Sequence, residues 1–404
     1  MKRSLFPSTA ILLTVILAAA AATAQQSPRT DTPSYTAGNP QPLRVAIVGL
    51  EHGHVEGFLS ALPKHTDVQL VGIADADANL IAKYQQKYNL DTSLFFKSEA
   101  NMIEVRKPQA VLVYTSIAQH RAAIDIAAQY GVSVMVEKPL TISLDDAYHI
   151  RSVAMQHHIH VLVNYETTWY ASNRAAFDQL RENKLGVVRR VVVHDGHQGP
   201  EEIGVPPEFL SFLTDPAQNG AGALYDFGCY GVDLMTWLMH GETPLTVTAI
   251  VNHDKPDKYR NVDDDATIIL QYPRAQAVIM PSWNWPFSRK DMEVYGATGY
   301  AITVGSDRLR LRYEHDDAEH TITAPPLEGV DRDSLSYLSA VMNGFVTPDG
   351  DDSTPVVGSG SHLTRPEDGF LSSLKTNITV MQILDAARKS ARTGQAVHLR
   401  PANE

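Results

Sequence analysis

The chain has 404 residues, enough for two domains, and with 44% hydrophobic and 20% charged residues it can bury a core, which excludes a wholly disordered protein. Its 46 acidic residues outnumber its 34 basic ones and no Lys/Arg block occurs, so a net charge of −12 disfavours nucleic acid and anionic membrane surfaces as partners. A single cysteine, Cys229, excludes an intramolecular disulfide and the zinc sites that need paired cysteines.

The first 24 residues have the features of a secretory signal peptide. Lys2 and Arg3 precede an apolar run over residues 10–22, and Ala22-Thr23-Ala24 is a small-x-small cleavage signal. An uncleaved membrane anchor is the alternative, but an anchor needs about 18–20 apolar residues. Residues 25–42, rich in Gln, Ser, Thr, Pro and Gly, are expected to form a flexible lead-in. The sequence therefore predicts an exported protein, periplasmic or secreted, with no membrane association after cleavage.

Residues 43–163 alternate between strand-length apolar runs and helical stretches. The runs LRVAIVGL, VQLVGIA, AVLVYTS and VSVMVEKP are joined to the intervening helices by short connections. This rhythm predicts βαβ units and a doubly wound parallel sheet, an α/β fold of the Rossmann type. Because ligands bind beyond the carboxyl ends of such strands, the residues that follow each strand are the informative ones.

The turn after the first strand, Gly49-Leu50-Glu51-His52-Gly53-His54, departs from the dinucleotide fingerprint G-x-G-x-x-G. Only Gly49 matches, because Glu51 brings a carboxylate toward the phosphates and His54 replaces the residue that packs helix on strand. Asp75 closes the second strand, about where an acidic residue accepts hydrogen bonds from the adenosine ribose; capping the next helix is its alternative role. We assign to this cofactor-binding edge Gly49, Glu51, His52, Gly53, His54 and Asp75.

His52 and His54, with Glu51, also raise the question of a metal ion, because imidazole and carboxylate are good ligands for divalent cations. Two histidines in one turn cannot close a site alone, and the remaining ligands would have to come from elsewhere. The alternative is a histidine pair at a helix N-terminus that donates to a phosphate or caps the turn. We therefore predict no metal site.

Residues 115–147 carry the strongest functional signal. Lys138 ends the buried strand VSVMV at the ligand-binding edge, where burial is expected to lower the pKa of its ammonium toward the range useful for proton exchange with a substrate hydroxyl. A surface lysine after a strand is the alternative.

Asp226 and Tyr230 lie four residues apart, hence on one face if the segment is helical. Asp226 follows the loop 220–222, where helix capping is its alternative role.

The pattern T-x-x-x-x-H, a helix, a strand and E-K-P resembles the glucose-fructose oxidoreductase/inositol dehydrogenase family (Gfo/Idh/MocA). The resemblance continues through GAGALYDFGCYGVDLMTWL, VDDDATIIL and YGATGY to ARKSARTGQAVHL, and so covers almost all of the mature chain. It implies that the Rossmann domain is followed by a second α/β domain, residues 164–404, with a large, mostly antiparallel open sheet, and that the protein forms homo-oligomers. The residues in register are Thr115, His120, Glu137, Lys138 and Pro139.

The resemblance also implies roles for the site residues. Lys138 matches the family's catalytic lysine, and Tyr230 stands where the family often has histidine but where its glucose-fructose oxidoreductase and dihydrodiol dehydrogenase branches have tyrosine. We assign Lys138 and Tyr230 to proton transfer, with the Tyr230 phenol hydrogen-bonded near the lysine. We assign Asp226 to orienting the substrate hydroxyl. The expected cofactor-binding set is completed by Thr115, Ser116, His120, Glu137 and Lys138.

These observations predict an exported NAD(P)-dependent oxidoreductase that moves a hydride between a nicotinamide cofactor and a hydroxyl or keto group of a sugar or polyol. We expect NAD rather than NADP, because Asp75 repels a 2′-phosphate and no Arg or Lys follows it before Lys83. Two alternatives remain. One is a redox-neutral carbohydrate lyase or hydrolase with a tightly held nicotinamide or a metal, and the other is a noncatalytic carbohydrate-binding protein.

Three further groups are weaker candidates. Trp283 and Trp285 offer ring faces to a sugar, although two aromatics at this spacing on a strand more often pack one sheet face. Asp195 and His197 are candidate substrate contacts without assigned roles. The acidic run 263–265 is expected to be a solvated segment at the start of a strand.

Overall fold

The structure of the protein is a computed structural model, which describes residues 41–348, 363–364 and 371–399. The expected signal peptide, residues 1–24, lies outside the described residues, as does the expected lead-in, residues 25–42, apart from its last two residues. In the described ranges no helix is both long enough and apolar enough to cross a lipid bilayer.

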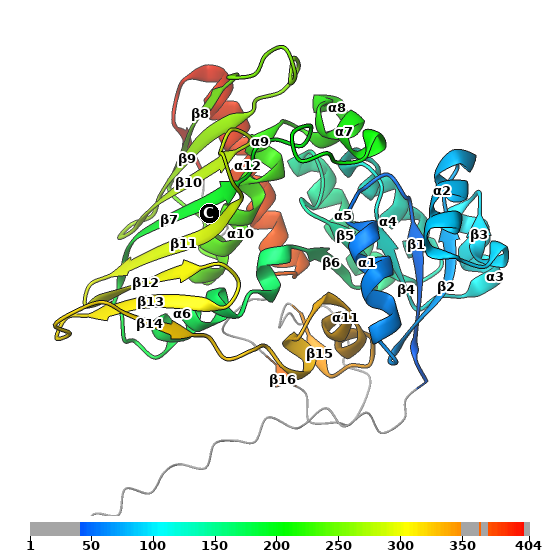
Figure 1. Cartoon of the computed structure of the whole chain (residues 1–404), viewed down its shortest axis with the longest axis horizontal. Helices are drawn as coiled ribbons and strands as arrows, with labels where there is room; N and C mark the ends of the chain where they lie inside the picture. Colours follow the sequence, from blue (N-terminus) through cyan, green and yellow to red (C-terminus); the bar gives the residue numbers. More distant parts are fainter. Residues whose placement is uncertain (1–40, 349–362, 365–370, 400–404) are drawn as a thin grey trace, which may run out of the picture. The chain divides into compact units, whose positions relative to one another are not determined.

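The first part of the described chain forms a parallel sheet of six strands (Figure 1). Its strand order is β3-β2-β1-β4-β5-β6 and every pair is parallel, so the predicted doubly wound arrangement is confirmed. All residues of β4 and β5 are buried, which is why these strands are largely apolar instead of alternating. The strands are β1 (Leu43–Val48), β2 (Val68–Ala74), β3 (Phe95–Phe96), β4 (Ala110–Val113), β5 (Ser133–Glu137) and β6 (Val161–Asn164).

Helices connect the parallel strands, and three of them begin at side chains that accept a backbone N–H of the first turn. These side chains are Asp77, Ser98 and Ser143. Asp77 and not Asp75 caps the helix after β2, so the alternative role considered for Asp75 is wrong. The helices are α1 (Val55–Ala61), α2 (Ala78–Tyr88), α3 (Glu99–Arg106), α4 (His120–Gln129) and α5 (Leu144–His157), with short 3₁₀ turns η1 (Leu62–Lys64), η2 (Thr92–Leu94) and η3 (Ile117–Gln119).

The second sheet has nine strands in the order β14-β13-β12-β11-β7-β10-β9-β8-β17. Only β10 and β7 pair in parallel, which confirms the predicted large, mostly antiparallel sheet. Burial alternates along β9 and β13, so one face of the sheet is covered and the other is exposed. The strands are β7 (Val188–Gly196), β8 (Thr246–Asn252), β9 (Asp265–Gln271), β10 (Gln276–Ser282), β11 (Arg289–Gly296), β12 (Gly299–Val304), β13 (Arg308–Tyr313), β14 (His320–Thr323) and β17 (Val397–His398).

Helices α10 and α12 pack against the covered face, as Figure 1 shows. Every residue of α10 is buried, and α12 contacts both β8 of the nine-stranded sheet and α5 and β6 of the parallel one. The remaining elements of this part are η4 (Glu166–Trp169), α6 (Ala171–Arg181), α7 (Pro207–Leu213), α8 (Pro216–Asn219), α9 (Ala223–Asp226), α10 (Gly228–Leu238), η5 (Gly329–Asp331), α11 (Ser334–Met342), α12 (Leu374–Thr393) and the short paired strands β15 (Val346–Thr347) and β16 (Leu363–Thr364).

Asp263 and Asp264 of the acidic run are buried and Asp265, the first residue of β9, is partly buried, so the expectation of a solvated segment is wrong. The Asp263 carboxylate accepts the backbone N–H groups of Gly222 and Leu224 at 2.9 and 2.6 Å, and Asp264 accepts two other backbone N–H groups at 2.8 and 2.6 Å. A Cβ atom at Gly222 would lie 1.8 Å from the Asp263 carbonyl oxygen, so only glycine fits there. The run therefore anchors the loop that leads into α9 and Asp226.

Candidate active site

A pocket of about 290 Å³, here called the Lys138 pocket, lies beyond the carboxyl end of β5. Residues from the turn after β1 and from the end of β5 form one wall, and residues from the nine-stranded sheet and the segment 197–230 form the rest. Its polar groups converge on a largely apolar lining, which is typical of small-molecule sites. The lining residues are Gly53, His54, Lys138, His197, Pro200, Ile203, Val205, Pro206, Phe209, Leu213, Asp226, Phe227, Tyr230 and Lys290.

Lys138 and Asp226 form a buried ion pair in this pocket. The Lys138 ammonium donates to the Asp226 carboxylate and, at 2.9 Å, to the Asp226 carbonyl oxygen. Burial disfavours the charged form of each side chain, but the partner's charge outweighs it, so the pKa of Lys138 is raised and that of Asp226 is lowered. The expectation that burial lowers the pKa of Lys138 is therefore wrong. Trp283 donates to the other Asp226 oxygen at 3.0 Å and is fully buried, so it cannot stack on a sugar.

Tyr230 lies close to two ammonium groups. The Lys138 and Lys290 Nζ atoms are 5.1 and 4.8 Å from its ring centroid, which is cation–π distance. Among the described residues no hydrogen bond is made by the Tyr230 hydroxyl, so the predicted hydrogen bond to Lys138 is absent from the structure. Burial raises the pKa of Tyr230, so the phenol is neutral. Asp226 ends α9 and Tyr230 lies in α10, yet both line the pocket, as their spacing predicted.

Lys290, which the sequence analysis missed, also lines the pocket. It lies on β11 directly across from Asp195 on β7, and its ammonium is bound by the Glu166 carboxylate. Asp195 is fully buried, its oxygens have no hydrogen-bond partner in the described part of the chain, and burial raises its pKa well above the usual range. His197 lines the pocket, and burial lowers its pKa to about 4, so the imidazole is neutral. The one signal in the sequence was strand alternation, because Lys290 lies two residues before the apolar Met292 and so on the same face of the strand.

The turn after β1 is shaped by Gly49, whose φ of +82° is a conformation that favours glycine. A Cβ atom there would meet the Thr115 side chain and backbone at 2.5 and 2.8 Å, so glycine also allows the ends of β1 and β4 to approach. The Glu51 carboxylate accepts the backbone N–H of Ser116 at 3.1 Å. Burial raises the pKa of Glu51, and the nearby Asp75 adds to that effect.

The remaining residues assigned to the cofactor lie around this turn. Asp75 accepts the backbone N–H of Leu50 at 2.8 Å, which ties the end of β2 to the turn. Thr115 contacts Gly49, and the Ser116 hydroxyl donates to Gln218 of α8. His120 is fully buried behind the E-K-P segment, where its ring bonds the Leu140 carbonyl oxygen at 3.1 Å. Burial lowers the pKa of His120 to about 4.

Three of the assigned residues converge at the edge of the pocket. The Glu137 carboxylate is bonded by His54 Nδ1 at 2.8 Å and by the Asn164 amide at 3.0 Å. The His52 ring lies 4.5 Å from the His54 ring and is fully buried. A Cβ atom at Gly53, between the two histidines, would lie 2.8 Å from the Phe209 ring, so glycine is needed for α7 to cover this turn.

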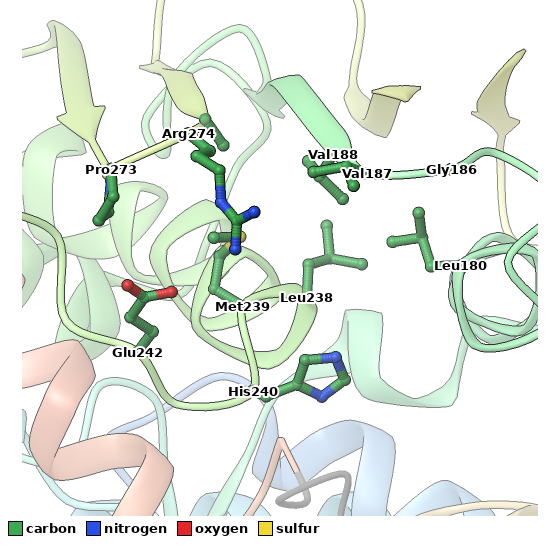
Figure 2. A pocket seen from close by; sticks show the side chains of 11 residues that line it. Leu180, Gly186, Val187, Val188, Leu238, Met239, His240, Glu242, Pro273 and Arg274 are labelled. Atoms are coloured by element: carbon green, nitrogen blue, oxygen red, sulfur yellow. The ribbon is translucent and has the colours of Figure 1, made fainter. Parts of the chain in front are cut away.

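A second pocket, of about 360 Å³, lies where β7 begins and α10 ends (Figure 2). Figure 2 shows Leu180, Leu238 and Val188 around one side of it and the Arg274 side chain extending toward Met239. Within the described ranges no hydrogen bond or ion pair joins its polar side chains, which are His240, Glu242 and Arg274, whereas those of the Lys138 pocket include a buried ion pair. The Lys138 pocket is therefore the candidate active site.

Both parts of the chain match models of one protein family. Residues 43–165 match the model described as oxidoreductase family, NAD-binding Rossmann fold, and residues 173–302 match the GFO/IDH/MocA C-terminal domain. Trans-1,2-dihydrobenzene-1,2-diol dehydrogenase of Homo sapiens is 24% identical over 229 residues, which are 57% of this chain and 64% of that protein. The match thus spans slightly less than two thirds of the relative.

Solved structures share the fold. Aldose-aldose oxidoreductase from Caulobacter crescentus, complexed with glycerol, has a TM-score of 0.71 at 20% identity and covers 89% of this chain and 100% of its own. An inositol dehydrogenase homologue from Azotobacter vinelandii, complexed with NAD+, has a TM-score of 0.73 at 18% identity and covers 89% of this chain and 98% of its own.

Proposed function

The chain belongs to the GFO/IDH/MocA family, whose two domain models together match more than half of it, and from this we propose an oxidoreductase acting on a sugar or polyol. The reaction is hydride transfer between a nicotinamide cofactor and a carbon that bears a hydroxyl or keto group. The observation that carries the proposal is the buried Lys138–Asp226 pair in a pocket that also presents the free Tyr230 hydroxyl. A pocket of about 290 Å³ is at the small end of the usual range for ligand sites, which suits a molecule of monosaccharide size.

The edge of the parallel sheet fits a nicotinamide dinucleotide. The Gly49 turn keeps side chains away from the junction of β1 and β4, and Asp75 closes β2, where an acidic side chain can accept from the adenosine ribose. Glu51 departs from the dinucleotide fingerprint, and its carboxylate accepts a hydrogen bond from the Ser116 backbone N–H. When bound, the cofactor supplies the hydride acceptor or donor.

Lys138 is held as an ammonium by Asp226, so in this pocket it acts first as a hydrogen-bond and proton donor. A donor at this position stabilises negative charge on the substrate oxygen as the carbon–oxygen bond order changes. In the reduction of a keto group, the ammonium supplies the proton that the product hydroxyl needs. In the reverse direction the same nitrogen takes that proton back.

Tyr230 and Asp226 support the lysine in different ways. The neutral Tyr230 hydroxyl is free to bond the substrate oxygen and relay its proton. Asp226 gives one oxygen to Lys138 and the other to Trp283, so it fixes the ammonium and the substrate contact first assigned to it is secondary.

The test is titration of the purified mature protein with NAD(H) and NADP(H), followed by tryptophan fluorescence, and then a screen of aldoses, polyols and glycosides for reduction or oxidation of the cofactor. We expect binding of at least one cofactor and turnover with a hydroxylated substrate. The Lys138→Ala variant should bind cofactor and lose turnover. Absence of binding of either cofactor at millimolar concentration would refute the proposal.

We also propose that the protein is exported, with cleavage after Ala24, on the strength of the apolar run and cleavage signal. Intact-mass measurement of protein from the periplasm or medium should give a chain beginning at Gln25. A variant without residues 2–24 should remain in the cytoplasm. If the full-length protein and the variant without residues 2–24 were found in equal proportions in the cytoplasm, the proposal would be contradicted.

The exposed face of the nine-stranded sheet supports a homo-oligomer. Ile250 on β8 and Ile269 on β9 are 64% and 41% exposed and lie on the same face of neighbouring strands. Light scattering after size-exclusion chromatography should give a mass of at least two chains, and the double variant Ile250→Lys/Ile269→Lys should reduce it. A monomeric mass for the unaltered protein would contradict this assignment.

A further inference from the structure

We infer that His52, His54 and Glu137 form a binding site for one divalent cation at the edge of the Lys138 pocket. One ligand atom from each side chain lies within 4.8 Å of the other two. The residues come from two separate segments, the turn after β1 and the end of β5, which the parallel sheet brings together. The inference does not depend on the proposed hydride transfer.

The third ligand of the site is Glu137, which could not be identified from the sequence. The two histidines alone cannot close a site, but Glu137 lies 83 residues further on and its carboxylate is already 2.8 Å from His54 Nδ1. Its second oxygen accepts from the Asn164 amide at 3.0 Å. A ligand carboxylate that is oriented by an outer hydrogen bond is typical of protein metal sites.

The surroundings hold two ligands in position and leave the third adjustable. His52 and Glu137 are 1% and 2% exposed, and the Phe209 ring lies 4.4 Å from the His52 ring. The His54 side chain is 40% exposed and lines the pocket. Ligand atoms on one ion at about 2.0–2.2 Å lie at most roughly 4 Å apart, so the group must contract slightly, and rotation of His54 can supply that movement.

Local charge permits a cation despite the adjacent lysine. Lys138 follows Glu137 directly, but its ammonium is bonded to the Asp226 carboxylate and carbonyl oxygen. The ligand set itself contributes one negative charge from Glu137. An ion there keeps a net positive charge facing the pocket, so its open positions would favour a hydroxyl or carboxylate oxygen of a ligand.

The ligand types point to a first-row transition metal or zinc. Two imidazole nitrogens and one carboxylate suit Zn²⁺, Mn²⁺, Fe²⁺ or Co²⁺, whereas Mg²⁺ and Ca²⁺ prefer oxygen ligands alone. Three protein ligands also leave at least one position open, as in sites that bind a further ligand. The alternative is an ordinary hydrogen-bonded His54–Glu137 pair with His52 packed beside it.

The experiment uses the mature protein, stripped with EDTA and titrated with Co²⁺, Zn²⁺ and Mg²⁺ separately. Visible absorption follows Co²⁺, and elemental analysis after dialysis gives the stoichiometry. We expect one Co²⁺ or Zn²⁺ per chain and no comparable binding of Mg²⁺. His54→Ala and Glu137→Gln should weaken Co²⁺ binding at least tenfold, whereas His240→Ala, an exposed histidine outside the group, should not.

His54→Ala is the decisive variant, because its exposed side chain can be removed without opening the core. Circular dichroism without metal checks that the variant is folded, because His54 also bonds the buried Glu137 carboxylate at 2.8 Å and its loss lowers the melting temperature. Binding below one equivalent, or binding unchanged in His54→Ala, would overturn the inference. NAD(H) binding is measured on the same preparations, so metal binding without cofactor binding refutes only the proposed function, and cofactor binding without metal binding refutes only this inference.

Discussion

Asp226→Asn is the most informative single change, because it removes one charge from a buried ion pair and keeps the size of the side chain. Lys138 and Asp226 are 4% and 6% exposed, so the variant leaves an ammonium buried without its counterion. Loss of one partner of a buried pair costs about 3–5 kcal/mol in the free energy of unfolding. With an entropy of unfolding of about 2.1 cal/mol/K per residue, a folded unit of this size should lose roughly 4–7 °C in melting temperature.

The same pair makes the effect depend on pH. Folding lowers the pKa of Asp226 below its ordinary 3.8 and raises the pKa of Lys138 above its ordinary 10.5. The stabilisation from Asp226 is therefore complete above pH 3.8 and is lost as the pH falls through the folded pKa. The stabilisation from Lys138 is complete below pH 10.5 and is lost as the pH rises through the folded pKa. The difference between the two proteins should be constant near neutrality and narrow only below pH 3.8 or above pH 10.5.

Calorimetry at pH 7 measures the shift, and two controls interpret it. Glu319→Gln breaks the exposed Arg310–Glu319 pair and should cost less than about 1 kcal/mol. The double variant Lys138→Met/Asp226→Asn removes both charges and should recover much of the lost stability. If Asp226→Asn melts within 1 °C of the unaltered protein, or if the double variant is no more stable than the single one, the pair is not the buried ion pair described here.

Three further changes test the other parts of the site. Tyr230→Phe should cut turnover by about 10²–10⁴ with cofactor affinity unchanged in a fluorescence titration, and near-full turnover would make the tyrosine a packing residue. Asp75→Ala should weaken NAD more than NADP in the same titration; equal losses would mean that Asp75 serves only the Leu50 turn. Glu51→Gln removes a carboxylate near the phosphate turn and should tighten NAD binding by roughly 5–10-fold, about 1–1.4 kcal/mol, and unchanged affinity would show that the cofactor avoids this side chain.

The doubly wound parallel sheet could be predicted because its longer strands are local apolar runs that alternate with helices, and such βαβ connections follow physical rules. Lys138 could likewise be placed at the ligand-binding edge, since it directly follows a buried strand. The charge state of Lys138 could not be predicted, because it depends on Asp226, 88 residues away, and no local pattern specifies such a partner.

Two other features were hidden for the same reason. Asp263 and its neighbours were expected to be solvated, because nothing nearby in the sequence shows that the backbone N–H groups of Gly222 and Leu224 donate to Asp263. Lys290 was not singled out, because nothing near it in the sequence shows that β11 brings its side chain to the pocket beside Tyr230. Local periodicity predicts elements, but long-range contacts decide which charges become buried.

The contact of α12 with the parallel sheet links the end of the chain to its first domain. Val163 of the edge strand β6 donates its backbone N–H to Ser372, just before α12, and the Tyr165 hydroxyl donates to Asn377 within it. The edge of the first sheet is thus covered by residues more than 200 positions later in the chain. A chain in synthesis exposes this edge until α12 has been made, and a truncation before residue 372 would leave a strand edge open to pairing with other chains.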